Sequence, residues 1–314
     1  MCHPHRIAIV GAGHVGATTA YALLLSGLTP EIVLMDRDER RAEGEAMDLA
    51  HAVPFADPVR VWAGTWDEAA DAAVVVLAAG VGQKPGETRL ELVSRNAAIF
   101  RDLVPRIVQR NPEAILLVAT NPVDVLTWVS IGASGVVPGR IIGSGTILDT
   151  ARFRSLLSRH LGVEARSVHA YVIGEHGDSE VALWSLANVG GIPLADFQAV
   201  TGQRLTDETR RAIVEDTRRA AYQIIERKGA TYYAVAAGLV RIIQAILRDE
   251  SAVLTVSSLV SGCYGLGDVC LSLPCIVNRT GVVRALTPPL SVEELTGLQQ
   301  SARVLGDAQA GVGD

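Results

Sequence analysis

The stretch IAIVGAGHVG, residues 7–16, decides the fold class of this chain. Four apolar residues of the kind found in a buried strand run directly into the pattern GxGxxG. In such a unit Gly11 permits a tight turn, Gly13 lets the backbone approach a pyrophosphate, and Gly16 lets the next helix pack closely on the strand. A helix beginning near His14 would supply N–H groups and positive potential for the phosphates. A glycine turn that serves packing alone is the alternative, but the strand-turn-helix context favours a dinucleotide-binding turn.

Strand-like apolar runs recur through the first half of the chain, separated by loops and by stretches of helical period. The predicted strands are Arg6–Val10, Glu31–Asp36, Val59–Ala63, Ala73–Ala79 and Ala114–Ala119. Strands joined by right-handed helical crossovers form a parallel sheet, whose ligands bind beyond the carboxyl ends of the strands. We therefore expect a doubly wound, Rossmann-type α/β domain over residues 1–145.

The second half of the chain has a different pattern, typical of a mixed α+β domain over residues 146–314. Helices are predicted at residues 148–161, 207–228, 232–249 and 291–305, and strands at 167–173, 181–189, 253–259 and 269–277. We expect this half to carry the substrate and catalytic groups.

Composition and charge exclude several classes of protein. The chain has 314 residues, a formal net charge of −6 and no basic stripe, which argues against binding to nucleic acid. Its four cysteines lack CxxC spacing, which favours a reducing compartment, and we expect the cytoplasm. The uncharged stretch of residues 7–30 resembles a secretion signal or a membrane span, but its glycines argue against both. With 49% hydrophobic and 20% charged residues, the chain is expected to bury surface between subunits.

Asp36 ends the second predicted strand, where a carboxylate can accept hydrogen bonds from the adenosine ribose and repel a 2′-phosphate. This position favours NAD over NADP. Arg37 and Arg41 keep NADP open, because cations there could hold a phosphate. A carboxylate that only caps the following helix is the plain alternative.

The segment IGEHGDSE, residues 173–180, places His176 between two glycines directly after an apolar strand. Imidazole titrates near neutrality, and a neighbouring carboxylate would fix its tautomer and stabilise its protonated form. The segment LDTARFR, residues 148–154, offers Asp149 for that role and Arg152 for a bidentate grip on a substrate carboxylate. A surface ion pair between Asp149 and Arg152 is the alternative.

Two further segments follow predicted strands. GVGQKPGETRLELVSRN, residues 80–96, has the glycines, proline and charges of a mobile lid that would bring Arg89 to the substrate carbonyl. ATNPVDVLT, residues 119–127, puts Asn121 where its amide could hold the substrate oxygen or the nicotinamide ribose. A solvated loop and an Asn-Pro turn are the respective alternatives.

Taken in order, these motifs and KGATYY resemble the lactate/malate dehydrogenase family over nearly the whole chain. The resemblance implies an NAD-dependent oxidoreductase that acts on a small 2-hydroxy acid. His176 would accept the proton, with Asp149 as its partner, Arg152 as the carboxylate clamp and Arg89 as the polarising lid arginine. Further cofactor contacts are expected at Val15, Arg41, Gly80, Val81, Thr120 and Ser144, and substrate contacts at Asp124 and Thr231.

Within this family, Gln83 favours lactate and pyruvate over malate, since a neutral amide leaves a second substrate carboxylate without a counter-ion. Arg154 and His169 match positions that bind fructose 1,6-bisphosphate in bacterial members, and the resemblance implies a homotetramer of glycolysis and fermentation. A malate dehydrogenase and a catalytically silent dinucleotide-binding protein remain the rival hypotheses. No metal is expected.

Overall fold

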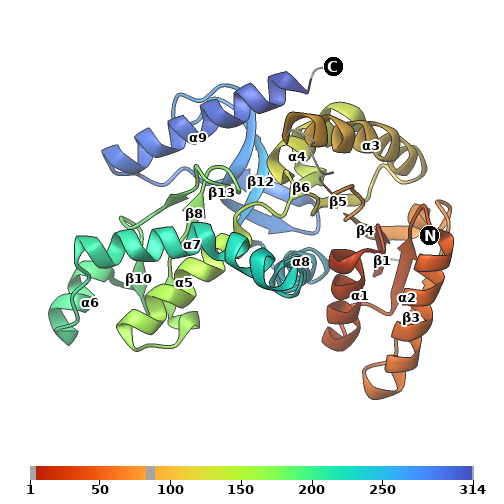
Figure 1. Cartoon of the computed structure of the whole chain (residues 1–314), viewed down its shortest axis with the longest axis horizontal. Helices are drawn as coiled ribbons and strands as arrows, with labels where there is room; N and C mark the ends of the chain where they lie inside the picture. Colours follow the sequence, from red (N-terminus) through yellow and green to blue (C-terminus); the bar gives the residue numbers. More distant parts are fainter. Residues whose placement is uncertain (1–4, 83–88, 313–314) are drawn as a thin grey trace.

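The computed structural model describes residues 5–82 and 89–312. Its centre is a nine-stranded sheet in the order β14-β13-β12-β6-β5-β4-β1-β2-β3 (Figure 1). The first six strands pair in parallel. They are β1 (Arg6–Val10), β2 (Glu31–Met35), β3 (Arg60–Ala63), β4 (Ala72–Leu77), β5 (Ile115–Val118) and β6 (Ile141–Gly143). The order of these six strands reverses between β1 and β4, which is where doubly wound sheets bind their ligands.

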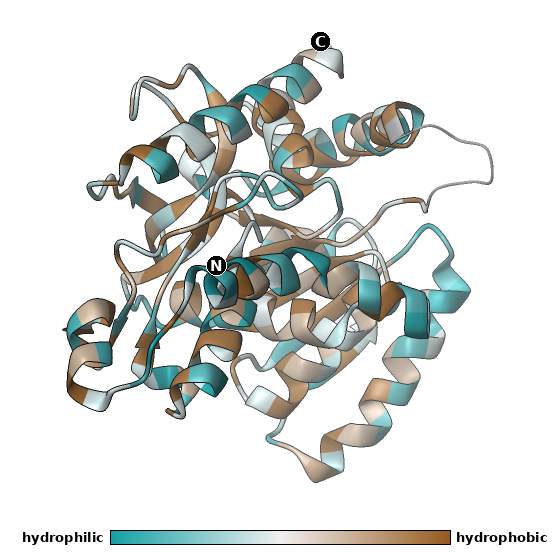
Figure 2. Cartoon of the chain, turned by 60° about the vertical axis from the view of Figure 1, so that its left-hand side comes forward, coloured by the Kyte–Doolittle hydropathy of each residue, from teal (hydrophilic) through white to brown (hydrophobic). Residues whose placement is uncertain are grey.

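Helices cover both faces of this parallel part. On one face, α1 (His14–Ser26), α2 (Glu39–Ala52) and α8 (Tyr233–Leu247) pack on side chains such as Ile7 and Ile9. On the other, α3 (Arg89–Arg110) and α4 (Val123–Ser134) pack on Ala8 and Val10. Successive strand residues point to opposite faces, so a strand covered on both sides must be apolar throughout. This explains the unbroken apolar run of residues 7–10 in β1. Figure 2 shows the apolar strands in the interior of the molecule, between helices that also carry hydrophilic residues.

The second half adds three antiparallel strands to the same sheet. β12 (Ala252–Val260) pairs with β13 (Val269–Asn278), which pairs with β14 (Gly281–Ala285). A single residue pair, Ser257 with Gly143, joins β12 to β6. The expected parallel sheet is thus confirmed, and it continues into a mixed sheet across both halves of the chain.

The rest of the second half consists of helices and two small sheets. The helices are α5 (Ile147–Leu161), α6 (Leu194–Thr201), α7 (Asp207–Lys228) and α9 (Val292–Gly311). The short strands are β7 (Val168–His169), β8 (Val172–Ile173), β9 (Val181–Ala182), β10 (Asn188–Val189) and β11 (Ile192–Pro193). No helix within the described residues is long and apolar enough to cross a membrane.

Two predicted strands are wrong in extent. The run 167–173 is split into β7 and β8, which belong to different sheets, and the run 181–189 is split into β9 and β10. At the first break, Thr150 of α5 accepts a hydrogen bond from the backbone N–H of Val172, and Thr146 donates to its carbonyl. Side chains of a helix therefore replace part of the strand ladder, which apolar composition cannot reveal.

Candidate active site

The glycine turn between β1 and α1 has the conformation that the sequence predicts. Gly11 has a φ of 105°, and a β-carbon there would press on the backbone of Ala79. A β-carbon on Gly16 would collide with the carbonyl oxygen of Gly11, so the tight packing of helix on strand needs glycine. Beside Gly13, in contrast, lies open space. A phosphate can therefore approach the backbone at Gly13, and the turn fits a dinucleotide.

The predicted cofactor residues gather along one edge of the sheet. Arg41 lies in the first turn of α2, and each of the others follows the carboxyl end of a strand: Val15 and the glycines after β1, Asp36 after β2, Gly80 and Val81 after β4, Thr120 and Asn121 after β5, and Ser144 after β6. Because these strands are parallel, their carboxyl ends meet at a common edge. The structure thus brings together the cofactor residues that the sequence marks separately.

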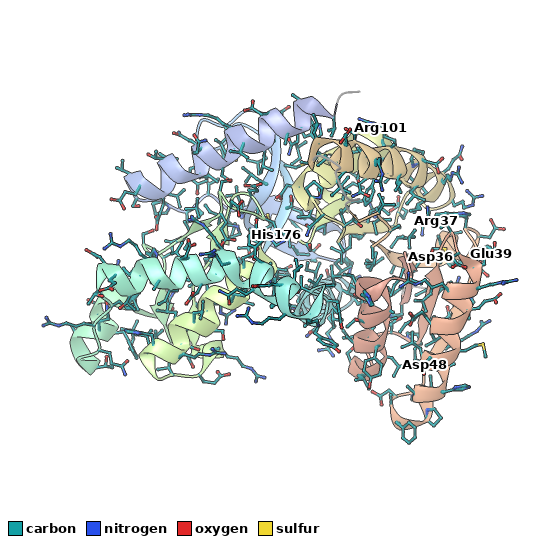
Figure 3. The ribbon with its side chains drawn as sticks, in the orientation of Figure 1. Asp36, Arg37, Glu39, Asp48, Arg101 and His176 are labelled. Atoms are coloured by element: carbon teal, nitrogen blue, oxygen red, sulfur yellow. The ribbon has the colours of Figure 1, made fainter. Side chains whose placement is uncertain are left out.

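Asp36 contacts the glycine turn and does not cap the next helix. Its Oδ2 accepts a hydrogen bond of 2.7 Å from the Ala12 N–H, and its Oδ1 accepts one of 3.0 Å from Asp38. The N-cap of α2 is Asp38, whose side chain accepts from the Arg41 N–H. Figure 3 shows Asp36 and Arg37 at this end of α2. The capping alternative for Asp36 is therefore wrong.

Asn96, on α3, contacts two of the loops predicted to bind the cofactor, and the sequence analysis did not single it out. Its side-chain Oδ1 accepts from the Val81 N–H at 2.9 Å, and its Nδ2 donates at 3.4 Å to the carbonyls of Val81 and Asn121. It is only 2% exposed. Asn96 thus ties two of the cofactor loops together. The signal available was a polar residue among apolar helix positions in the segment 80–96.

The centre of the site is a chain of three side chains from two elements. Asp149 and Arg152 lie in the first turns of α5, and His176 lies in the turn after β8. The Asp149 Oδ2 lies 2.5 Å from His176 Nδ1, and its Oδ1 accepts at 2.6 Å from Arg152 Nη1. Asp149 is 2% exposed, so a solvated surface pair is excluded. The predicted contact between Asp149 and His176 is therefore present, and the ion pair between Asp149 and Arg152, which the sequence offered as a surface alternative, forms beside it in a largely buried position.

The electrostatics of this pair favour a protonated histidine. Burial alone would lower the pKa of His176, but the Asp149 carboxylate outweighs burial and raises that pKa to about 9. Burial in turn raises the pKa of Asp149, while His176 and Arg152 outweigh it and hold that pKa below its ordinary value. With Asp149 ionised, Nδ1 of His176 carries a hydrogen, and Nε2 is left to exchange a proton with a ligand.

Asp124 and Glu180 also lie in this centre. Asp124, in the first turn of α4, accepts a hydrogen bond of 2.8 Å from the main-chain N–H of His176. Glu180 is buried, and its pKa is raised to about 8 by burial and by the charge of Asp149. Sequence reasoning assigned no role to Glu180, because a glutamate after a glycine-rich turn gives no sign of burial.

The remaining predicted residues are spread more widely. Gln83 lies outside the described residues, and Arg89 begins α3, with a side chain that is outside them too. Thr231 lies between α7 and α8, next to Tyr232, whose ring stacks on His14 of the cofactor turn at 5.2 Å. Thr231 is thus the sequence neighbour of Tyr232, which contacts the glycine turn predicted to bind the cofactor.

Arg154 and His169 lie on the side of α5 and β7. Arg154 donates to the carbonyl of Ala165 at 3.3 Å, and its buried Nε has no hydrogen-bond partner among the described residues. His169 is exposed. A guanidinium and an imidazole are therefore present on neighbouring elements.

This arrangement can exchange a proton at His176 Nε2 while a guanidinium beside it holds a carboxylate, next to an edge that fits a dinucleotide. Within the described residues, no cluster of histidine, cysteine and acidic side chains could hold a metal ion. The chemistry that this donor set supports is proton transfer coupled to an electron-accepting cofactor.

Comparison with known proteins agrees with this geometry. Residues 5–143 match the family model of the lactate/malate dehydrogenase NAD binding domain, and residues 146–311 match the alpha/beta C-terminal domain of the same family. The chain is 53% identical over 308 residues to an L-lactate dehydrogenase of Thermus aquaticus, covering 98% of this chain and 99% of that protein. It is 50% identical over 301 residues to one of Thermoanaerobacter sp. (strain X514), covering 96% and 97%.

Two solved structures share the architecture. A lactate dehydrogenase enzyme, MGS-M5, from a Medee basin deep-sea metagenome library superposes with a TM-score of 0.96 at 43% identity, covering 99% of each chain. A minor L-lactate dehydrogenase of Enterococcus mundtii in a ligand-bound form gives 0.94 at 42% identity, covering 98% of each. The similarity therefore extends over both halves of the chain.

Proposed function

The chain belongs to the lactate/malate dehydrogenase family, and from this premise we propose that it interconverts L-lactate and pyruvate with NAD as the hydride carrier. The observation that carries the proposal is the hydrogen-bonded chain Arg152–Asp149–His176, built around a buried Asp149, beside the edge of the sheet that fits a dinucleotide. It joins a proton-exchanging group to a carboxylate-binding group, which are the two groups that oxidation of a 2-hydroxy acid requires.

NAD is the cofactor of this family domain, and the residues present fit it. The open space at Gly13 admits the pyrophosphate, and the Asp36 carboxylate lies where it can bind a ribose and disfavour a 2′-phosphate. When bound, the nicotinamide accepts or returns the hydride at C2 of the substrate. The protein has to orient the substrate and to move one proton.

His176 performs the proton transfer in this proposal. In pyruvate reduction its protonated Nε2 donates to the developing alkoxide, and in lactate oxidation its neutral Nε2 accepts the hydroxyl proton. Asp149 holds the ring by Nδ1 and stabilises the imidazolium. Because the pKa of His176 is raised to about 9, the resting protein is prepared for reduction at neutral pH.

Arg152 orients the substrate. Asp149 occupies its Nη1, and its side chain is 13% exposed, so the rest of the guanidinium fork remains to pair with the substrate carboxylate. Arg89 is proposed as the cation that polarises the carbonyl, and Gln83 as the neutral residue that disfavours a second carboxylate. Asn121 and Thr231 are proposed as the remaining contacts to the substrate.

Assembly and regulation are part of the same proposal. Exposed apolar side chains on α1 and α2, namely Tyr21, Leu25 and Met47, support burial between subunits in a homotetramer. The Nε of Arg154, which has no hydrogen-bond partner within residues 5–82 and 89–312, and the exposed His169 support an anion site for fructose 1,6-bisphosphate. We also propose a cytoplasmic protein of glycolysis and fermentation, with a functional boundary between residues 1–145 and 146–314.

The test is NADH oxidation followed by nicotinamide absorbance, with pyruvate or oxaloacetate, each with and without fructose 1,6-bisphosphate. Higher kcat/KM with pyruvate is expected. Higher kcat/KM with oxaloacetate would make the chain a malate dehydrogenase, and no turnover with either would favour a silent dinucleotide-binding protein. Stimulation by the bisphosphate that disappears in Arg154→Gln would support the effector site.

A further inference from the structure

Asp124 is a buried carboxylate that the reaction scheme above does not use. It is 2% exposed, and its Oδ2 accepts the main-chain N–H of His176 at 2.8 Å. Its Oδ1 is also buried, and the Ser257 hydroxyl interacts with the carboxylate. A buried charge is costly even where a hydroxyl and an amide N–H bind it. An ionised Asp124 therefore needs a reason beyond stability.

The groups that face Asp124 come from three elements. They are Glu175 and His176 in the turn after β8, Ser257 on β12 and Cys270 on β13. Burial raises the pKa of Asp124 to about 6, a rise that the Ser257 hydroxyl, the His176 amide and the charge of His176 limit. The pKa of the Cys270 thiol is raised well above its ordinary value, so Cys270 stays neutral. His176 is thus the one member of this set that can become a cation.

Asp124 and His176 each affect the pKa of the other. The Asp124 carboxylate contributes to raising the pKa of His176, after the larger contribution of Asp149. His176 is consequently held at two points: Asp149 of α5 binds ring Nδ1, and Asp124 of α4 binds the main chain. Two anchors from different helices fix both the position of the backbone and the direction of the ring.

We propose that Asp124 is a positioning residue for proton transfer, which holds the main chain of His176 and stabilises its protonated imidazole, and that it makes no contact with the substrate. This inference rests on the proposed role of His176. It replaces the substrate contact that the sequence suggested for Asp124 with an indirect role through the histidine.

Two substitutions can separate the hydrogen bond that Asp124 accepts from the His176 N–H from the negative charge of Asp124. Asp124→Asn keeps an oxygen that accepts the His176 N–H and removes the charge. Its new amide would face the Ser257 hydroxyl, whose oxygen can accept a hydrogen bond from it. Asp124→Ala removes both the anchor and the charge.

Asp124→Asn should weaken proton transfer but should not lower the unfolding temperature of the protein. The folded-state pKa of Asp124 lies above its ordinary value of 3.8, so its ionised form destabilises the fold above about pH 6. Asp124→Asn removes that cost, and it should unfold at the same or a higher temperature than the parent protein at pH 7.5. A carboxylate kept for structure alone would give a lower unfolding temperature in this variant.

The decisive measurement is the pKa of His176, followed by NMR of histidine-labelled protein without substrate. In Asp124→Asn we expect that pKa to fall by roughly one unit, and the alkaline limb of kcat/KM for pyruvate reduction to move to lower pH with it. In Asp124→Ala we expect, in addition, roughly a tenfold loss of kcat, because the main chain of His176 loses its anchor.

Asp178→Asn is the matched control. Asp178 is two positions from His176, but it is exposed and accepts a hydrogen bond from Tyr222 at 3.0 Å. Its removal should leave the pKa of His176 in place. An unchanged pKa and an unchanged alkaline limb in Asp124→Asn would overturn the inference, and so would a shift of equal size in the control. If the parent protein did not reduce pyruvate, the proposed function would fail, whereas the NMR titration would still decide on Asp124.

Discussion

The dinucleotide edge and the histidine centre are built by different means. The dinucleotide edge, which is the edge of the sheet beside Gly11, Gly13 and Gly16, depends mainly on backbone conformation. Gly11 allows a tight turn and Gly16 allows a close contact between α1 and β1, and a side chain at either position would prevent this. At the histidine centre, formed by Asp149, Arg152 and His176, the buried carboxylate of Asp149 binds the two partly buried cationic side chains. Substitutions at the edge should therefore affect folding and cofactor affinity, whereas substitutions at the centre should affect the rate of reaction and its pH dependence.

The largest effect is expected from His176→Asn. It removes the proton donor and should lower kcat for pyruvate reduction by about 10²–10⁴-fold, while NADH binding measured by fluorescence stays close to that of the parent protein. A variant that still turned over at the parental rate would show that another group moves the proton. Loss of NADH binding would break the separation between centre and edge.

Arg152→Lys should have the next largest effect. Lysine keeps the charge but cannot form the planar fork that binds both Asp149 and a substrate carboxylate. We expect kcat/KM for pyruvate to fall by roughly 10²-fold, mostly through KM, which corresponds to about 3 kcal/mol. Arg159→Lys, on the exposed far end of α5, is the control and should be kinetically silent. Equal kinetics for Arg152→Lys and the parent would remove the clamp from the proposal.

The pH dependence tests the electrostatic description of the centre. Because Asp149 raises the pKa of His176 to about 9, kcat/KM for pyruvate reduction should be flat through neutrality and fall about tenfold per unit above pH 9. Lactate oxidation requires the neutral ring and should rise with pH up to the same point. Asp149→Asn should move both limbs to lower pH. A reduction profile that already falls near pH 6.5 would contradict the raised pKa.

At the dinucleotide edge, Gly16→Ala should act on folding. The added methyl group would collide with the Gly11 carbonyl, and the free energy of unfolding should fall by about 1–3 kcal/mol. NADH affinity should fall as well, since α1 must move away from β1. Gly13→Ala has open space for its methyl group and should leave the unfolding free energy nearly unchanged in the absence of NADH. Equal destabilisation by the two changes would contradict the close packing at Gly16.

The smallest effect is expected far from both regions. Ser291 caps α9 in a reciprocal capping box with Glu294. Ser291→Ala should lower the free energy of unfolding by about 1 kcal/mol in denaturant titrations, without changing kcat/KM or its pH profile. A changed pH profile in this variant would show that electrostatics of the centre extend farther than the contacts of Asp149 indicate.

The sequence by itself determined most of the parallel half of the fold. β1, β2, β4 and β5 are buried on both faces, so they appear as apolar runs, and the glycine turn after β1 is contained in six consecutive residues. β3, at the edge of the sheet, is only half-buried, and β6, which is three residues long, has no counterpart among the predicted strands. The same local character made Asp36 and His176 recognisable, because each follows a strand directly. The spacing of three residues between Asp149 and Arg152 was enough to predict that both lie on one face of α5.

Only the tertiary structure decided how charges are shared in the centre. Asp124 is separated from His176 by 52 positions and Asp149 by 27, and no local pattern states that both carboxylates reach the same histidine. The burial of Glu180 and the ties made by Asn96 also depend on neighbours that are distant in sequence. Hydrophobic periodicity indicates which face of a helix or strand is buried. The pKa of a buried group, in contrast, depends on every charge packed around it, and those charges come together only when the chain has folded.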